Sequence, residues 1–205
     1  MISKEENILL EAEKLFAEKG FDGTSTREIS KAANVNISMI SYYFGSKEKL
    51  FEKIFEYRMR EGIDFASNVF QRQDINTWEK MMLIIDRYVE RVKNHKDFYQ
   101  IFQREQINRK NPAIVEALIN SKKEFMELYV NIVDEGLESG IFTNRPDVEF
   151  MHCTISGSLF AAMNALPVYR EFYTENKNYE ATYYERLSTH IKKIMKYLLG
   201  YEQNL

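Results

Sequence analysis

The chain has little of what many protein classes depend on: one cysteine, three prolines and eight glycines among 205 residues. The single cysteine, Cys153, excludes an internal disulfide and a zinc site built from cysteines, and we expect it to be a small buried residue. So few turn-forming residues disfavour a fold of many short strands. Because no run of about 18 apolar residues occurs and the N-terminus is charged, we expect a cytoplasmic protein without a membrane span.

An excess of positive charge and the usual catalytic motifs are missing as well. The net charge is −3, and residues 1–60 carry as many Asp and Glu as Lys and Arg. Composition alone therefore does not indicate nucleic-acid binding. The histidines, His95, His152 and His190, lack the spacing of a metal site, and there is no phosphate-binding glycine loop or nucleophile motif. The sequence predicts no enzyme activity, no metal and no cofactor.

What the chain does contain is 44% apolar residues, spaced as in amphipathic helices. The predicted fold class is all-α, with about nine helices. Capping patterns mark helix starts at Ser3, Ser46, Asn76 and Asn111. A further helix is expected to start at Pro146 and to stop at Pro167, before a loop at about 168–179.

The most informative stretch is residues 24–47, which predicts two short helices joined by a tight turn. Ser25 and Glu28 form a capping box at the first helix, whose apolar face is Ile29, Ala32 and Ala33. The turn is residues 34–36, where Asn34 can adopt the left-handed conformation. The second helix, about 37–44, turns Ile40 and Phe44 inward. Its outward face is Ser38, Met39, Ser41, Tyr42 and Tyr43, which is typical of a recognition helix in the DNA major groove.

The residue order T-S-x-R-E-I-x-x-A-A-x-V-x-x-S-x-I-x-Y-Y-F-x-S-K-E-x-L resembles the DNA-binding domain of the TetR family of bacterial transcriptional regulators. The resemblance is close from about Ile8 to Phe55. It implies contacts to phosphate and base edges by Thr26 and Arg27, and contacts to bases by Ser38, Met39, Ser41 and Tyr43. It also implies phosphate contacts by Tyr42 and Lys47.

The chain departs from this family at two places. Asn34 stands where the family usually has Gly, and residues 37–39 (Ile-Ser-Met) stand where Lys-Gly-Thr is frequent. The second departure changes base-reading positions, so no operator sequence can be transferred from the family.

The predicted domains are a helix-turn-helix domain at 1–46, a linking helix at 47–72 and a helical effector-binding and dimerisation domain at 73–205. Aromatic and methionine side chains of the last domain either line a cavity for an apolar effector or form plain core. They are Trp78, Met82, Tyr88, Phe98, Phe102, Phe125, Tyr129, Phe150 and Phe160.

Small residues at 154–162 indicate that a second helix approaches closely around Gly157. The partner helix is either internal or from another subunit. The resemblance implies pairing of the last two long helices across a two-fold axis, with Gly157, Ala161, Leu187, Ile191 and Ile194 at the dimer interface.

The expected function is that of a homodimeric, ligand-responsive regulator, and we predict a repressor. Its expected partners are a pseudo-palindromic double-stranded DNA operator and a small-molecule effector. Repressor and activator are not distinguished by the sequence. The alternative is an all-helical ligand- or protein-binding module of the same fold without sequence-specific DNA binding.

Overall fold

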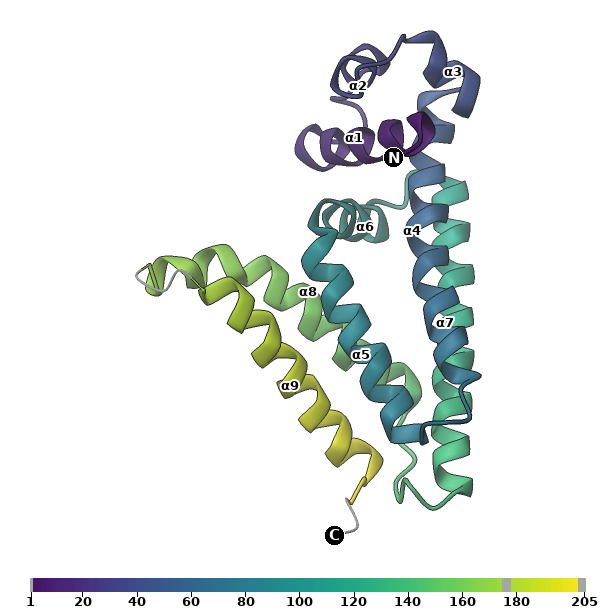
Figure 1. Cartoon of the computed structure of the whole chain (residues 1–205), viewed down its shortest axis with the longest axis vertical. Coiled ribbons are helices and arrows are strands. Elements are labelled where there is room, and N and C mark those ends of the chain that lie inside the picture. Colours follow the sequence, from purple (N-terminus) through teal and green to yellow (C-terminus); the bar gives the residue numbers. More distant parts are fainter. Residues whose placement is uncertain (1, 175–177, 203–205) are drawn as a thin grey trace. The chain divides into compact units, whose positions relative to one another are not determined.

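The computed structural model describes residues 2–174 and 178–202, and every regular element within them is a helix (Figure 1). This confirms the all-α prediction and the expected number of helices for the described part of the chain. The nine helices are α1 (Lys4–Lys19), α2 (Thr26–Ala32), α3 (Ser38–Phe44), α4 (Lys47–Phe70), α5 (Thr77–Asn94), α6 (Lys96–Asn108), α7 (Pro112–Glu138), α8 (Val148–Phe172) and α9 (Tyr179–Leu199).

The chain forms two compact units. Unit 1 comprises Met1–Glu61 and His95–Ser121, and unit 2 comprises Gly62–Asn94 and Lys122–Leu205. Helices α4 and α7 contribute residues to both units. Since α6 and the start of α7 belong to unit 1, compactness divides the chain differently from the predicted boundaries at 46 and 73. The functional division stays a prediction.

Most helix ends follow the predicted capping residues. Asn76 accepts a hydrogen bond from the Glu79 amide at 2.9 Å, while the Glu79 carboxylate accepts one from the Asn76 amide at 2.8 Å. The hydroxyl of Ser46 caps α4 by accepting from the Lys49 amide at 3.2 Å. Gly20 ends α1 with φ at 76°, a left-handed value that favours glycine. Local side-chain chemistry therefore sets these boundaries.

The prediction that Pro167 stops a helix is wrong. Helix α8 starts at Val148 behind the cap Asp147 and continues through Pro167 to Phe172. Proline removes one hydrogen bond from a helix, yet the exposed residues beyond it stay helical, and the Tyr169 ring lies 6.2 Å from that of Tyr183 on α9. The expected loop is therefore helical at its start, and its residues 175–177 lie outside the described part.

Two expectations about buried residues, at Ala32 and Cys153, are also wrong. Ala32 is exposed, while Ile29 and Ala33 of the same helix are buried. Cys153 is exposed on α8, one turn before Gly157. Cysteine is among the most frequently buried residue types, but the position of a residue on its helix decides whether it is buried. Residue 153 lies on the exposed face of α8, together with Gly157 and Ala161.

A series of aromatic rings forms the core of unit 1. The ring of Phe51 on α4 lies 4.9 Å from Phe16 of α1 and 5.0 Å from Phe21 of the following loop. Along α4, Phe51 contacts Phe55, which in turn lies 5.5 Å from Phe98 of α6. Such edge-to-face and tilted pairs each add about 0.5–1.5 kcal/mol beyond area burial. The series joins the first helix, α4 and α6 into one core.

A buried ion pair fastens α1 to α4 within unit 1. Arg58 donates to both carboxylate oxygens of Glu13, at 2.8 and 3.0 Å, and both side chains are buried. Another guanidinium nitrogen lies 3.4 Å from Nε2 of His95, the cap of α6. Burial raises the pKa of Glu13, although the bonds from Arg58 oppose that shift. A pair that is buried on both sides is costly to break by removing one partner.

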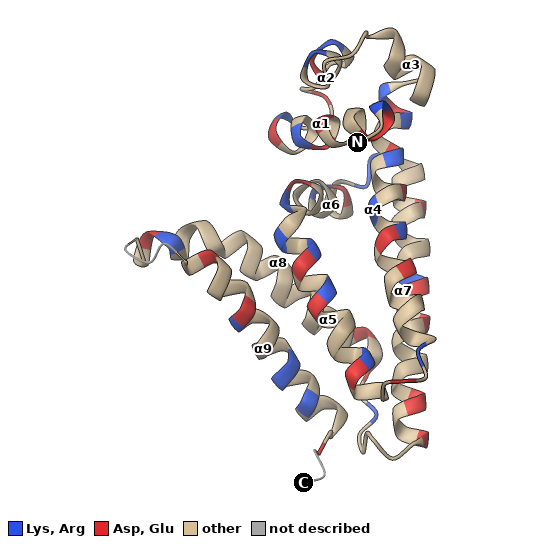
Figure 2. Cartoon of the chain, in the orientation of Figure 1, with Lys and Arg blue, Asp and Glu red and all other residues tan. Residues whose placement is uncertain are grey.

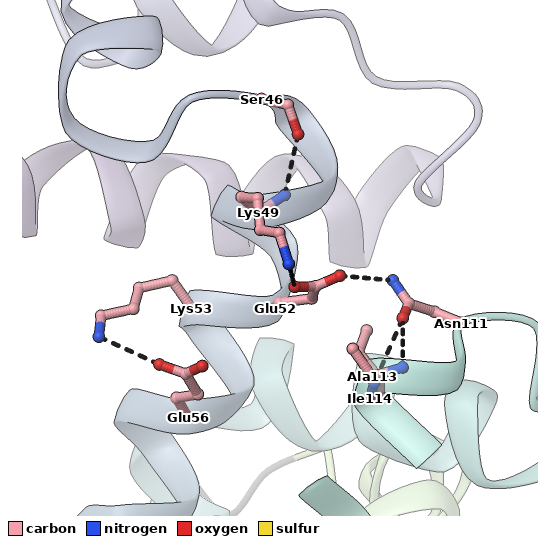
Figure 3. Close-up of polar contacts among 8 residues, drawn as sticks. All are labelled: Ser46, Lys49, Glu52, Lys53, Glu56, Asn111, Ala113 and Ile114. Atoms are coloured by element: carbon pink, nitrogen blue, oxygen red, sulfur yellow. Dashed lines mark hydrogen bonds and ion pairs between the residues drawn. The ribbon is translucent and has the colours of Figure 1, made fainter. Parts of the chain in front are cut away.

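Asn111, at the start of α7, links this helix to the second turn of α4 (Figure 3). Its side-chain oxygen accepts from the amides of Ala113 and Ile114 at 3.0 and 3.2 Å and so caps α7. Its side-chain nitrogen reaches Glu52 of α4 at 3.5 Å, and Glu52 also binds Lys49 at 2.7 Å. One side chain therefore both starts α7 and connects it to α4.

In unit 2, helices α5, α8 and α9 pack against one another. Their apolar stripes meet in a core whose fully buried members include Ile85, Ile155, Leu159, Ile191 and Met195. This core also contains an ion pair between helices α5 and α7. Lys80 is only 1% exposed and donates to both carboxylate oxygens of Glu135, at 2.8 and 3.1 Å.

Candidate nucleic-acid interface

The turn between α2 and α3 has the geometry predicted for a helix-turn-helix motif. Asn34 has φ at 52°, so asparagine occupies the left-handed conformation that glycine adopts most easily. The side-chain oxygen of Asn36 accepts hydrogen bonds from the Ser38 amide and hydroxyl, both at 2.9 Å. Asn36 therefore starts α3, a role that its place two residues before the helix could have indicated.

The outward face of α3 carries no charged side chain, and in Figure 2 the whole helix is drawn in tan. Ser38, Ser41 and Tyr42 are exposed, and Met39 and Tyr43 are half-buried. Tyr42 is the most prominent, at 81% exposed, and its ring packs edge-on against Tyr43 at 5.0 Å. Ile40 and Phe44 point into the core as predicted. The exposed hydroxyl groups on this face can therefore form hydrogen bonds with a binding partner.

The start of α2 is held by a complete capping box. Ser25 accepts from the Glu28 amide at 3.3 Å, and Glu28 accepts from the Ser25 amide at 2.8 Å. Glu28 also binds Lys19 at 2.9 Å, and this bond, followed by those from Ser25, lowers the pKa of Glu28 to about 2. The cap places Thr26, which is half-buried, and Arg27, which is exposed and has no acidic partner within the described residues.

Lys47, at the first position of α4, points back toward the loop between α1 and α2. Its ammonium donates to the carbonyl oxygens of Phe21 and Thr24 at 2.9 and 3.0 Å. It also lies 4.1 Å from the centre of the Phe21 ring. The group expected to contact phosphate is therefore already bonded within the chain.

The nine residues proposed to line an effector cavity are divided between the two units. Phe98 and Phe102 belong to unit 1, where Phe98 is buried against Phe55, and the other seven belong to unit 2. Within unit 2 the rings of Tyr88 and Phe160 meet at 6.4 Å. Of the seven, Trp78 stacks on Tyr201 at 4.3 Å, and Phe150 is 71% exposed, so it offers its ring to solvent rather than to the interior.

A buried polar pair in unit 2 was not predicted. Tyr129 of α7 is buried, and its ring lies 5.7 Å from that of His152 on α8. Nδ1 of His152 is buried and has no hydrogen-bond partner among the described residues. Burial, with a smaller contribution from the charge of Lys122, lowers the pKa of His152 to about 4, so the ring is neutral at pH 7. The helical spacing of His152 with buried Ile155 and Leu159 was the available signal.

The predicted dimer residues differ in how much surface they offer. Gly157 and Ala161 are exposed on α8, and a side chain at Gly157 would meet nothing within 4 Å. The described part of unit 2 therefore provides no close helix partner for Gly157. On α9, Leu187 and Ile194 are half-buried, but Ile191 is fully buried and has no surface to offer a partner.

Comparison with known proteins gives matches in both halves of the chain. The family described as "Bacterial regulatory proteins, tetR family" matches residues 8–54, and "Tetracyclin repressor-like, C-terminal domain" matches residues 78–194. Among relatives, the repressor NicS of Pseudomonas putida is 50% identical over 52 residues, which are 25% of this chain and 24% of NicS. YttP of Bacillus subtilis is 28% identical over 154 residues, 73% of this chain and 72% of YttP.

Solved structures share the fold along the whole chain. FadR of Bacillus subtilis in complex with stearoyl-CoA superposes with a TM-score of 0.69 at 19% identity, covering 96% of this chain and 98% of FadR. PfmR of Thermus thermophilus gives a TM-score of 0.72 at 18% identity, with both chains fully covered. No helix in the described residues is both long and apolar enough to span a membrane. With a helix-turn-helix motif at one end and a matching C-terminal domain over more than half its length, the chain belongs to the TetR family of bacterial transcriptional regulators.

Proposed function

We propose that this regulator is a cytoplasmic, homodimeric repressor that releases its operator when a small, largely apolar effector binds the C-terminal domain. The observation that carries DNA binding is the outward face of α3. This face presents hydroxyl and aromatic groups without the acidic partners that solvent-exposed helices usually carry. No catalytic step is part of the proposal.

The proposed DNA contacts come from two helices. The exposed Arg27 and the neighbouring Thr26 reach phosphate and base edges from α2, while Ser38, Met39, Ser41 and Tyr43 face the bases from α3. Tyr42 contacts phosphate beside them, because its exposed hydroxyl can donate to an oxygen. In a dimer, two such surfaces about 34–36 Å apart would read a pseudo-palindrome one helical turn in length.

The proposed effector site lies among the helices of unit 2. Tyr88, Phe125 and Phe160 supply apolar surface, and His152 supplies a polar atom without a partner inside the chain. A neutral imidazole can either donate or accept, so it suits an effector with one buried hydrogen-bonding group. The stearoyl-CoA held by FadR is consistent with an apolar effector in this fold.

Selection of preferred duplexes from random DNA tests the first half of the proposal. We expect a two-fold symmetric sequence, and we expect Ser41→Ala and Tyr42→Ala to weaken its binding without lowering the unfolding temperature. Selection of no preferred sequence would instead favour a ligand- or protein-binding module of the same fold.

The second half is tested by release of the selected operator. Acyl-CoA esters of increasing chain length are suitable first probes, with free coenzyme A as the control. A coupling of about 1–3 kcal/mol between effector and operator is the expected size for an allosteric regulator. Stronger binding of the operator in the presence of every effective ligand would indicate a co-repressor or an activator.

A further inference from the structure

The ammonium group of Lys47 makes three contacts within unit 1. A lysine has three N–H donors. Two carbonyl oxygens, of Phe21 and Thr24, accept from it at 2.9 and 3.0 Å, and the face of the Phe21 ring lies at 4.1 Å. An aromatic face attracts a cation electrostatically. Two of the three N–H donors are therefore already bonded in the free protein, so a DNA phosphate could accept only from the third unless it displaced these bonds.

The loop that Lys47 binds determines where α2 begins. It follows Gly20, which has φ at 76°, and it ends at Ser25, the cap of α2. The buried Thr24 hydroxyl lies 2.8 Å from the Gly20 carbonyl oxygen and 3.1 Å from that of Leu15, which ties the loop to α1. Lys47 ties the same loop to α4 through two further carbonyls.

We propose that Lys47 is a positioning residue that holds the loop at residues 20–25, and thereby the start of α2, in its DNA-binding geometry. This inference rests on the proposed DNA-binding function, but it assigns Lys47 a role other than that of a phosphate contact. The residues positioned in this way are Thr26 and Arg27, which follow the cap directly. Lys47 supports operator binding through them and is not itself part of the interface.

The chain provides a matched control two residues further along α4. Lys49 carries the same charge in the same helical turn, but it pairs with Glu52 on the helix surface (Figure 3). The two side chains lie 2.7 Å apart, and that of Lys49 is 68% exposed. Neutralising Lys49 removes a positive charge close to that of Lys47 without touching the loop. Lys47→Met and Lys49→Met therefore separate the loss of the loop contacts from the loss of charge.

Amide hydrogen exchange of the free protein tests the inference without DNA. In Lys47→Met we expect the amides of residues 21–28 to exchange at least ~10-fold faster, because their local opening becomes easier, while α3 keeps its protection. Lys49→Met should leave all of these rates unchanged. Unchanged exchange at residues 21–28 in Lys47→Met would overturn the proposal, whatever the operator affinity.

Operator binding at about 50–200 mM salt separates positioning from phosphate contact. We expect Lys47→Met to bind roughly tenfold more weakly at each salt concentration, and Lys47→Gln, which keeps N–H donors but no charge, to recover part of the loss. If Lys47→Gln and Lys47→Met bind equally, and both salt slopes are lower by about 1, Lys47 contacts phosphate and the proposal is wrong.

Two results would distinguish the proposal from failures elsewhere. Should Lys47→Met not fold, as judged by its circular dichroism, the comparison of Lys47→Gln with wild type takes its place in both measurements. Faster exchange in the loop with unchanged operator affinity would overturn the positioning role while leaving the DNA-binding function intact. If the wild type selects no DNA sequence, the proposed function fails, and the exchange rates alone report whether Lys47 holds the loop.

Discussion

The two compact units differ in where their notable polar side chains lie, at the surface in unit 1 and in the interior in unit 2. In unit 1 the outward face of α3 is exposed and uncharged, and the ion pair of Arg58 with Glu13 serves only to join helices. In unit 2 the unusual groups are internal: the neutral His152 beside Tyr129, and Lys80 bound to Glu135. A surface that meets a large polyanion must be open in advance, whereas a site for a small apolar molecule must exclude water.

The exposed face of α8 is the exception in unit 2, and Gly157→Leu tests it with the largest expected effect. The isolated chain has open space at this position, so the leucine should leave folding unchanged. If two subunits meet there, the dimer separates and operator binding falls by about 10²–10⁴-fold, the usual gain from joining two binding modules. Sedimentation and operator titration measure the two effects.

Ala181→Leu, also an exposed small residue made large on α9, is the control and should bind like the wild type. If the Gly157→Leu protein remained a dimer, the interface would lie elsewhere. The face of α3 would then be the only one of these two exposed surfaces with a proposed binding role.

Removing one partner of each buried ion pair compares the units directly. Arg58→Met leaves Glu13 buried without a partner and should lower the free energy of unfolding by about 3 kcal/mol. Adding Glu13→Leu should restore most of this loss. Lys80→Met should cost less, since Glu135 has a 41% exposed side chain and can be solvated. Urea unfolding measures the loss of unfolding free energy in each variant. Equal losses would contradict the expected difference between the two ion pairs.

The buried His152 predicts a specific pH dependence of stability. Its folded pKa of about 4 lies below the ordinary 6.5, so as the pH falls from 6.5 to 4 the unfolded chain binds a proton that the folded chain does not. Stability is therefore lost across this window, by at most roughly 3 kcal/mol for a difference of about 2.5 units. Below pH 4 this group should cause no further loss.

His152→Gln, which cannot titrate, removes this contribution. Unfolding free energies of wild type and variant should approach each other, or cross, between pH 6.5 and 4, because the carboxylates titrate in both proteins and cancel. Parallel curves over the whole range would show that the ring is accessible to protons in the folded state.

The smallest expected effect concerns specificity at Met39. An apolar side chain cannot read donors and acceptors, but it can contact a thymine methyl group. We expect a T·A preference at the facing base pair, worth less than the ~1–3 kcal/mol of a bidentate contact. Operator selection repeated with Met39→Ala should lose this preference alone. Identical selections would mean that α3 docks in another way.

The sequence was most informative where structure depends on neighbouring residues. The capping box of Ser25 and Glu28, the left-handed Asn34 and the inward Ile40 all follow from interactions within a few positions. The same reasoning predicted the starts of α5 and α7 from Asn76 and Asn111. Such signals lie in the sequence itself and need no knowledge of the tertiary packing.

The errors arose where distant residues decide. The helical spacing of Phe98 and Ile191 indicates an apolar face, but not whether that face meets core, ligand or partner. Pro167 was expected to end a helix because the cost of proline is local, while the contact of Tyr169 with Tyr183 on α9 depends on the tertiary fold. The hydrogen bond of Lys47 to Phe21, which lies 26 residues earlier, likewise depends on the tertiary fold, while the predicted phosphate contact of Lys47 stays a prediction. The family pattern supplies the position of Lys47, not its bonds.

The burial of Lys80 gives unit 2 a natural chemical reporter. Reagents that acylate amines need an accessible, uncharged nitrogen, and the Lys80 ammonium is enclosed between Glu135 and the Phe70 ring. Surface lysines should react with the reagent rapidly, whereas Lys80 should react only when its helix opens locally. Mass spectrometry of the peptide that contains Lys80 would therefore measure the rate of that opening in the wild-type protein. A bound effector should lower this labelling rate.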